Sequence, residues 1–328
     1  MVSFCLLSCG QKDSVQELPG PPGTEEIKPG EGGPGTRNWT TKTISEGLLL
    51  HIFSGQDQVT GKYQNVCVLD VDLNKDRYRI EFCVQESTNK ATSTVQKENG
   101  AVAALNATYE RTSVFIKANG KTYHNIENNL ISNAVDNWKN DGAIFLDADG
   151  KIYLEHSGKG KKLSEQRTYY RGHQCPNIFS SAPMLINDYD PVGETFVPVT
   201  MTEAQFEANY HYEHPYRHQG VTHPRTAVAL TEDNHLLLIT IDKDRDKLTI
   251  AGMTAKQVTQ FLKLHFNPQY ALNMDGGGST TLSVNGKVMN KPSGGSERTL
   301  PTHILVFDDQ RVLPLSQYNH ILLIWKMA

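Results

Sequence analysis

A glycine-rich stretch after the apolar run at 270–274 holds the greatest concentration of chemically useful groups in the sequence. Asp275 ends the run, and glycines and hydroxyl residues follow it: Gly276, Gly277, Gly278, Ser279 and Thr280. Successive glycines cost entropy on folding, but they let backbone N–H groups approach an anion closely. No lysine follows, so this is not a P-loop. The pattern predicts an anion site beside a carboxylate; the structural alternative is a glycine turn capped by Asp275.

Two arginines could present a planar guanidinium to such an anion. Arg225 and Thr226 follow a proline and begin an apolar run, while Arg298 follows Glu297 in a second Gly/Ser-rich stretch. A guanidinium binds a phosphate or carboxylate through two parallel hydrogen bonds. Asn106 ends a further run of small apolar residues and adds a polar amide. For Arg225 taken alone, a salt bridge at a strand edge is an equally good interpretation.

Two polar clusters resemble metal sites, but their spacing does not fit one. Asp242, Asp244 and Asp246 match the start of a calcium loop. The sixth and twelfth positions of that loop hold lysine and methionine, where glycine and glutamate are required. The histidines at 211–223 lack the H-E-x-x-H spacing of a zinc site. We therefore predict a charged turn and a polar loop, and we predict no metal and no cofactor.

The fold that positions these groups is predicted to be rich in strands. Short alternating or β-branched runs recur, and Asn-Gly or Asp-Gly pairs predict tight hairpins at 119–120, 149–150 and 285–286. Helices are fewer, and Thr202 and Thr254 each begin a capping box that predicts a helix. This balance indicates an α+β protein, with one large domain at 39–328 built on a mostly antiparallel or mixed β-sheet core.

The cysteines do not form a disulfide pattern. Cys67 and Cys83 lie in runs 64–73 and 78–85, which we predict to pair as a hairpin. Matching their apolar faces places Cys67 beside Val84 and turns Cys83 to the opposite side of the sheet. We therefore predict free, buried thiols.

The N-terminus indicates export and a membrane anchor. Residues 1–9 read MVSFCLLSC, which resembles the end of a bacterial lipoprotein signal with Cys9 as the lipid-bearing residue. Residues 10–38 include a Pro/Gly-rich stretch that cannot bury apolar surface, so we predict a flexible tether. The net charge of −4 argues against a nucleic-acid partner. We expect a lipid-anchored protein of the bacterial cell envelope, in the periplasm or at the cell surface.

Several separate motifs together resemble the phosphodiester glycosidase family. The resemblance covers roughly residues 95–308 and is carried, in order, by ALNATYE, SAPMLI, HPRTAVAL, ITID, ALNMDGGGSTTL and SERTLPTHILVF. The Asp-Gly-Gly-Gly-Ser-Thr and Glu-Arg elements are the most specific of these. One departure is that Ala-Thr-Tyr follows Asn106, where the family usually has glycine and an aromatic pair.

The resemblance implies hydrolysis of a sugar-1-phosphodiester at the anomeric carbon, which releases a free sugar and a phosphomonoester. Our hypothesis is that Arg225, Arg298 and the N–H groups of Gly276, Gly277 and Gly278 hold the phosphate. Asp275 and Glu297 are then the candidates for stabilising the oxocarbenium-like carbon and for activating water. The remaining contacts to sugar hydroxyls or phosphate oxygens are expected from Asn106, Thr226, Ser279 and Thr280.

Two other functions fit the same sequence. One is a non-catalytic lipoprotein that binds phosphorylated or acidic glycans in the same cleft. The other is a different hydrolase that acts on a phosphodiester of the cell envelope. Carbohydrate binders typically present flat aromatic side chains, yet none of the three tryptophans lies within the glycine-rich stretches, which favours the enzyme.

Overall fold

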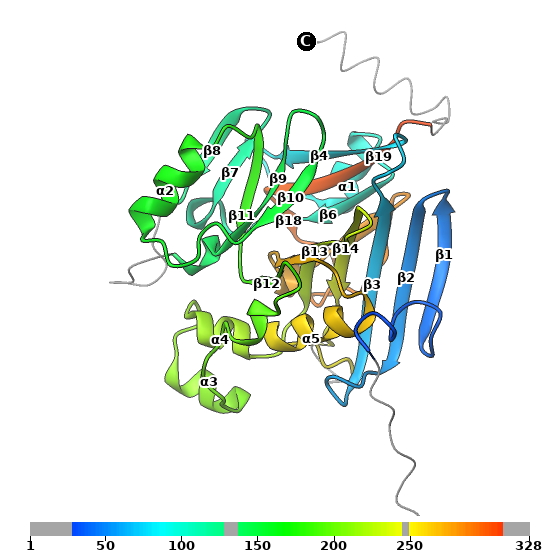
Figure 1. The fold of residues 1–328 in the computed structure, drawn as a ribbon, viewed down its shortest axis with the longest axis vertical. Coiled ribbons are helices and arrows are strands. Elements are labelled where there is room, and N and C mark those ends of the chain that lie inside the picture. Colours follow the sequence, from blue (N-terminus) through cyan, green and yellow to red (C-terminus); the bar gives the residue numbers. More distant parts are fainter. Residues whose placement is uncertain (1–27, 128–136, 245–248, 311–328) are drawn as a thin grey trace, which may run out of the picture.

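The computed structural model describes residues 28–127, 137–244 and 249–310 (Figure 1). Three predictions therefore lie wholly or partly outside these ranges. They are the lipidation site at Cys9, the first part of the tether and the charged turn at 242–246. The C-terminal residues 311–328 of the predicted domain also lie outside.

The largest sheet has seven strands in the order β1-β2-β3-β14-β13-β15-β12. All its neighbouring strands run antiparallel. In that order the strands are β1 (Trp39–Ser45), β2 (Leu48–Gln56), β3 (Tyr63–Asp72), β14 (His235–Ile241), β13 (Arg225–Leu230), β15 (Tyr270–Asn273) and β12 (Met184–Asn187). The start of β13 and the end of β15, which are antiparallel neighbours, bring two of the predicted motifs to the same end of this sheet.

Two five-stranded antiparallel sheets complete the strand framework, together with a short two-stranded pair. One sheet consists of β17 (Lys287–Val288), β16 (Leu282–Val284), β6 (Ala103–Asn106), β19 (Thr302–Asp308) and β4 (Tyr78–Val84). The other consists of β10 (Ile152–Glu155), β9 (Gly142–Leu146), β11 (Asn177–Ser181), β7 (Phe115–Ala118) and β8 (Lys121–Asn125). The short pair joins β18 (Thr299–Leu300) to β5 (Lys90–Ala91).

The α-helices are α1 (Thr92–Glu98), α2 (Leu163–Gly172), α3 (Glu203–Asn209), α4 (Pro215–Gly220) and α5 (Ala255–His265). Single 3₁₀ turns are η1 (Arg111–Ser113), η2 (Trp138–Asn140), η3 (Val192–Glu194) and η4 (Gly277–Ser279). Both predicted capping boxes are present, at Thr202 before α3 and at Thr254 before α5. Within the described ranges, no helix is long and apolar enough to cross a membrane.

One apolar core joins the three large sheets. It contains Leu69 from β3, Leu105 from β6 and Phe179 from β11, all with an exposed fraction of 0%. The opposite face of the seven-stranded sheet packs against α5 through a second core that includes Phe261 and Val258. Because a shared core holds the sheets together, the protein is a single α+β domain, as predicted, and Figure 1 shows its sheets stacked with few helices.

The tight turns were predicted correctly. Asn119 and Gly120 between β7 and β8, and Asn285 and Gly286 between β16 and β17, all have positive φ. This conformation is required by the two-residue turn that joins antiparallel strands with their natural twist. The Asp149-Gly150 pair lies in the longer connection 147–151 between β9 and β10, where Gly150 has positive φ and Asp149 does not.

The predicted hairpin at 64–85 is wrong. Strand β3 pairs with β2 and β14, whereas β4 pairs with β19 in another sheet. The turn at 73–77 therefore carries the chain from one sheet to the next, and both strands find partners distant in sequence. The predicted free thiols are confirmed, since Cys67 and Cys175 are buried and unpaired and Cys83 is half-buried and unpaired.

The end of the predicted tether packs on the domain. Residues 28–38 lie against the end of α5, where the Gly30 N–H donates to the carbonyls of Lys263 and Leu264 at 3.1 and 3.0 Å. The indole N–H of Trp39 donates to the Gly32 carbonyl at 3.2 Å. Strand β1 begins at Trp39 as expected, but the ordered contacts of the domain begin before it.

Candidate active site

A cavity of about 620 Å³ is formed where five sequence-distant segments meet. Its walls come from the residue before β5, the segment after β6, the region from before α4 to the start of β13, the turn after β15, and β18 with the residues beside it. Seven of the residues predicted for the site line it: Arg225, Asp275, Gly276, Gly277, Gly278, Ser279 and Arg298. The glycine stretch and both predicted arginines therefore share one cavity.

The glycine stretch forms the turn η4 and supports Arg298. Gly277 has a φ of +61°, a conformation that side chains rarely adopt. A Cβ atom on Gly278 would lie 2.5 Å from Cζ of Arg298, so the guanidinium rests directly on this glycine. The Gly277 N–H donates to the Pro224 carbonyl, whereas those of Gly276 and Gly278 have no acceptor within the described part of the chain. These two donors therefore remain available to a ligand.

Both backbone polar groups of Asp275 are hydrogen-bonded. Its N–H donates to the Ala107 carbonyl at 2.9 Å, and its carbonyl accepts from the Asn106 amide at 2.6 Å. Burial raises the pKa of the Asp275 carboxyl to about 7, against the lowering effect of a hydrogen bond with Ser279. A carboxyl with this pKa exchanges its proton near neutral pH, which is the property of a general acid or base.

Arg225 is a buried cation in the cavity wall. Its exposed fraction is 1%, and it donates to the carbonyls of Met253, His218 and Val221 and to the side chain of Gln219. Burial lowers the pKa of Arg225 to about 10, so it stays charged at neutral pH. The four acceptors are neutral, so the charge has no anionic partner among the described residues, and one of five N–H donors stays unused. This arrangement favours an anion in the cavity.

Arg298 differs from Arg225 in being exposed. It lines the cavity and forms no hydrogen bond or ion pair with any residue for which the structure gives a position. Its guanidinium therefore keeps all its donors for a ligand. The two arginines thus present one fixed charge and one adaptable charge to the same space.

Asn106, Thr226 and Thr280 are not brought to the cavity surface. Asn106 is fully buried and accepts from the Thr226 hydroxyl at 3.0 Å and from the Thr281 N–H at 2.9 Å. Thr280 is 1% exposed and does not line the cavity. Asn106 and Thr226 instead tie β6, β13 and the segment around Asp275 together, so their predicted contact with substrate is not seen in this geometry.

Glu297 also lies outside the cavity lining. Its carboxylate accepts the Ser93 N–H at 2.9 Å and the Ser93 hydroxyl at the start of α1. The residue at the helix N-cap, Ala91, has no side chain that could do this. Glu297 thus satisfies a free N–H group at a helix N-terminus, and the structure does not bring it beside Asp275.

Sequence reasoning missed several residues that line the cavity, including Glu110, Tyr212, His218 and His223. Tyr212 has an exposed fraction of 49%. Burial and the charge of Arg225 lower the pKa of both histidines, that of His223 to about 3, so both are neutral at pH 7. The signal was the density of tyrosine and histidine just before Arg225, which we interpreted as a polar loop. Within the described ranges, no group of three or more His, Cys, Asp or Glu side chains is placed so that it could hold a metal ion.

Comparison with solved structures identifies two similar folds. A hypothetical protein from Synechocystis has a TM-score of 0.58 and 13% identity; the match covers 84% of this chain and 64% of that one. The zebrafish N-acetylglucosamine-1-phosphodiester alpha-N-acetylglucosaminidase catalytic domain, auto-inhibited by its pro-peptide, has a TM-score of 0.53 and 17% identity. That match covers 86% of this chain and 87% of the zebrafish domain. At these identities the likeness shows the fold alone.

A search of curated proteins found no match. The sequence model of the phosphodiester glycosidase family matches residues 98–307, which contain Asp275, both arginines and the glycine stretch. This range also contains most of the cavity lining. The chain therefore belongs to the phosphodiester glycosidase family.

Proposed function

We propose that this protein is a hydrolase that cleaves a sugar-1-phosphodiester between the anomeric carbon and the phosphate oxygen. The observation that carries the proposal is that one cavity joins a carboxyl with a pKa near 7 to two arginines and a glycine turn. The zebrafish domain of similar fold is named for an N-acetylglucosamine-1-phosphodiester, which supports the substrate class. Sequence residues 1–9 further support a lipid-anchored protein of the bacterial cell envelope.

The phosphate is bound by groups that are already in place. Arg298 and the N–H groups of Gly276 and Gly278 supply free donors, and Arg225 supplies a buried charge. Preorganised donors of this kind cost no reorganisation during the reaction, and each contributes about 3–4 kcal/mol to catalysis. The exposed ring of Tyr212 at the same cavity offers an apolar face to a sugar.

Asp275 acts as the general base. A phosphomonoester is a good leaving group, so the reaction depends less on an acid than hydrolysis of an ordinary glycoside does. The oxygen of water bonds to the anomeric carbon while its proton passes to Asp275. The bond from that carbon to the phosphate oxygen breaks, and its electron pair leaves with the phosphate.

The test is to incubate the protein with N-acetylglucosamine-1-phosphodiesters and with cell-wall phosphodiesters and to measure the free sugar that is released. We expect kcat/KM to rise with pH through about 7, because only deprotonated Asp275 accepts a proton. Asp275→Asn lowers kcat by about 10³-fold. Arg298→Ala lowers kcat/KM by about 10²-fold.

Arg79→Ala, a change at an exposed arginine on β4, is the matched control and keeps the wild-type rate. Binding of these diesters by the wild-type protein without any cleavage would instead establish a glycan-binding protein.

A further inference from the structure

We propose that Glu110 is the second catalytic carboxylate of this cavity, an anion that stabilises positive charge on the anomeric carbon as its bond to phosphate breaks. The proposal rests on the function proposed above and places Glu110, instead of Glu297, beside Asp275 as the second carboxylate of the pair. It is carried by the placement of Glu110 in the cavity with Asp275 and by the ion pair that fixes it.

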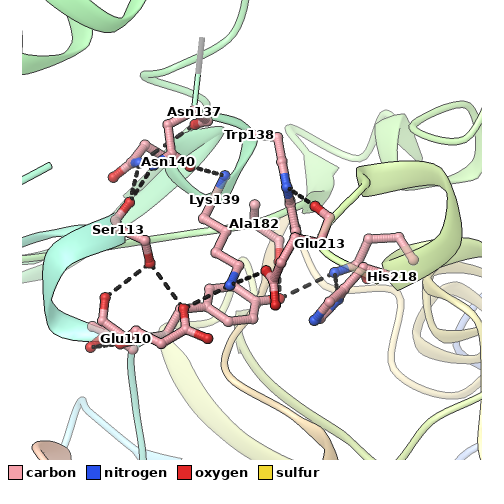
Figure 2. Close-up of polar contacts among 12 residues, drawn as sticks. Glu110, Ser113, Asn137, Trp138, Lys139, Asn140, Ala182, Glu213 and His218 are labelled. Atoms are coloured by element: carbon pink, nitrogen blue, oxygen red, sulfur yellow. Dashed lines mark hydrogen bonds and ion pairs between the residues drawn. The ribbon is translucent and has the colours of Figure 1, made fainter. Parts of the chain in front are cut away.

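Glu110 lies at the point where the chain leaves β6 and enters η1. Its side chain is 60% exposed and lines the same cavity as Asp275, so a ligand can reach it. The carboxylate is nevertheless held in place, because its Oε2 lies 3.0 Å from the Ser113 hydroxyl, whose single proton it shares with the Glu110 carbonyl at 2.9 Å. Figure 2 shows Ser113 on one side of Glu110 and Lys139 on the other.

Lys139 is the group that keeps Glu110 charged. Its side chain is 0% exposed, and its Nζ lies 2.7 Å from Oε2 of Glu110 and 2.9 Å from Oε2 of Glu213 (Figure 2). The ammonium also lies 4.8 Å from the ring centroid of Tyr109. A lysine buried this completely requires an anionic partner, so the ion pair constrains both residues.

Glu213 shares Lys139 but is a poor candidate for the same role. It does not line the cavity, and its side chain is only 22% exposed. Its backbone carbonyl is taken by the indole N–H of Trp138 at 2.9 Å. Glu213 therefore balances the charge of Lys139 from behind, while Glu110 faces the space that a substrate would fill.

The surroundings give the two cavity carboxylates, Glu110 and Asp275, different pKa values. Partial desolvation is the largest single effect on Glu110 and opposes its charge. The ion pair with Lys139 and the hydrogen bonds of Ser113 and the backbone together outweigh it, so the pKa of Glu110 lies below its ordinary value. The pKa of Asp275 is about 7, and the charge of Glu110 is one of the effects that raise it. At neutral pH Glu110 is thus a fixed anion and Asp275 exchanges a proton, the division of labour seen where a site assigns two carboxylates different tasks.

Other charged or titratable groups surround this pair. They are Lys139 and Glu213 behind Glu110, and Arg111, Arg225, Arg298, His218 and His223 around the cavity. The pKa of His223 is about 3 and that of His218 is well below its ordinary value, while the arginines stay charged. The change in activity near pH 7 therefore reports on Asp275 and on the charges that act on it.

The test compares two conservative variants in pH-rate profiles. We expect Glu110→Gln to lower kcat by about 10³-fold with little change in KM. We also expect the profile to move to lower pH, because a charge that raises the pKa of Asp275 is lost. Lys139→Gln should move the profile to higher pH, because Lys139 lowers the pKa of Asp275. Opposite shifts are not expected from a loss of structure alone.

Glu81→Gln is the matched control, because Glu81 is an exposed carboxylate that is paired with Arg79 on β4. It should leave rate and profile unchanged. Far-ultraviolet circular dichroism establishes that each variant is folded, and Glu110→Gln alone decides the matter where Lys139→Gln does not fold. If the wild type cleaves the diester and Glu110→Gln keeps more than a tenth of kcat, the role of Glu110 is refuted. If the wild type cleaves none, the proposed function fails first.

Discussion

The carboxyl of Asp275 has surroundings that suit proton transfer and oppose folding. Burial disfavours its charged form and raises its pKa to about 7, from an ordinary value of 3.8. Two hydrogen bonds, from its N–H to the Ala107 carbonyl and from the Asn106 amide to its own carbonyl, hold its backbone at the cavity. Reactive groups commonly lower the stability of the protein that holds them in this way.

Asp275 should therefore contribute to the pH dependence of stability, with a sign opposite to that of the buried neutral histidines His218 and His223. Between pH 4 and pH 7 the folded protein binds more protons at Asp275 than the unfolded chain does. The contribution of Asp275 to the free energy of unfolding accordingly falls as the pH rises across this window. Asp275→Asn removes the effect, so we expect its thermal midpoint to exceed that of the wild type at pH 8.

At pH 4 the side chain at position 275 is neutral in both the folded wild type and the Asp275→Asn variant. The thermal midpoints of the two proteins should therefore agree more closely at this pH. Thermal unfolding at pH 4, 6 and 8 measures this difference. If the thermal midpoint of Asp275→Asn exceeds that of the wild type by the same amount at all three pH values, the charge of Asp275 is not the source of the difference.

The site could be predicted from the sequence where residue type reveals chemistry. The glycine stretch, Asp275 and the two arginines do share a cavity, as their types suggested. Glu110 could not be found in this way, since its significance comes from Lys139, which is 29 residues further along the chain. Asn106 was recognised as special, but its amide supports the backbone of Asp275 rather than facing the cavity.

At the scale of single elements, helix α1 shows how a carboxylate can serve structure. Its N-terminus has no side-chain cap of its own, and Glu297 from a distant loop accepts the Ser93 N–H. The partial positive charge at a helix N-terminus also favours an anion there. The same loop continues into Arg298, so α1 helps to locate that arginine beside the glycine turn.

Glu297→Gln should therefore affect stability more than chemistry. We expect the free energy of unfolding to fall by about 1 kcal/mol, as for the loss of a helix cap. Chemical denaturation and initial rates of diester cleavage measure the two effects, and the rate should stay within about threefold of wild type because Glu297 does not line the cavity. A loss of kcat beyond about a hundredfold in a fully folded variant would return Glu297 to the catalytic group.

Local patterns predicted local elements well. The capping boxes and the Asn-Gly turns depend on residues a few positions apart, and both are present. The hairpin at 64–85 failed because pairing partners are chosen by the whole sheet. Both strands have apolar faces that would match each other, but β3 is enclosed by β2 and β14. Such competition between distant strands cannot be seen in one stretch of sequence.

At the scale of the whole molecule, the segment at 28–38 adds a layer over α5. The backbone of Gly33 passes close to His265. A Cβ atom added to Gly33 would lie 2.1 Å from the carbonyl oxygen of His265. The ring of His265 is 4% exposed beneath this segment. The segment thus shields one end of the second apolar core.

A chain that begins at Trp39 should be less stable than one that begins at Lys28. The shorter chain lacks the hydrogen bonds of Gly30 and Gly32, and we expect a loss of about 1–2 kcal/mol. Denaturation of the two chains under the same conditions measures the difference. Equal stability would show that residues 28–38 only rest on the surface.

The position of β6 has a consequence for biosynthesis. This strand ends just before Glu110 and lies between β16 and β19, with Leu105 opposite Leu282 and Ile304. Both β16 and β19 are synthesised long after β6. Strand β6 therefore has no pairing partner in this sheet until most of the remaining sequence has been translated. Contacts of such long sequence separation form slowly. The protein should therefore acquire its activity only after β19 has been synthesised and has paired with β6.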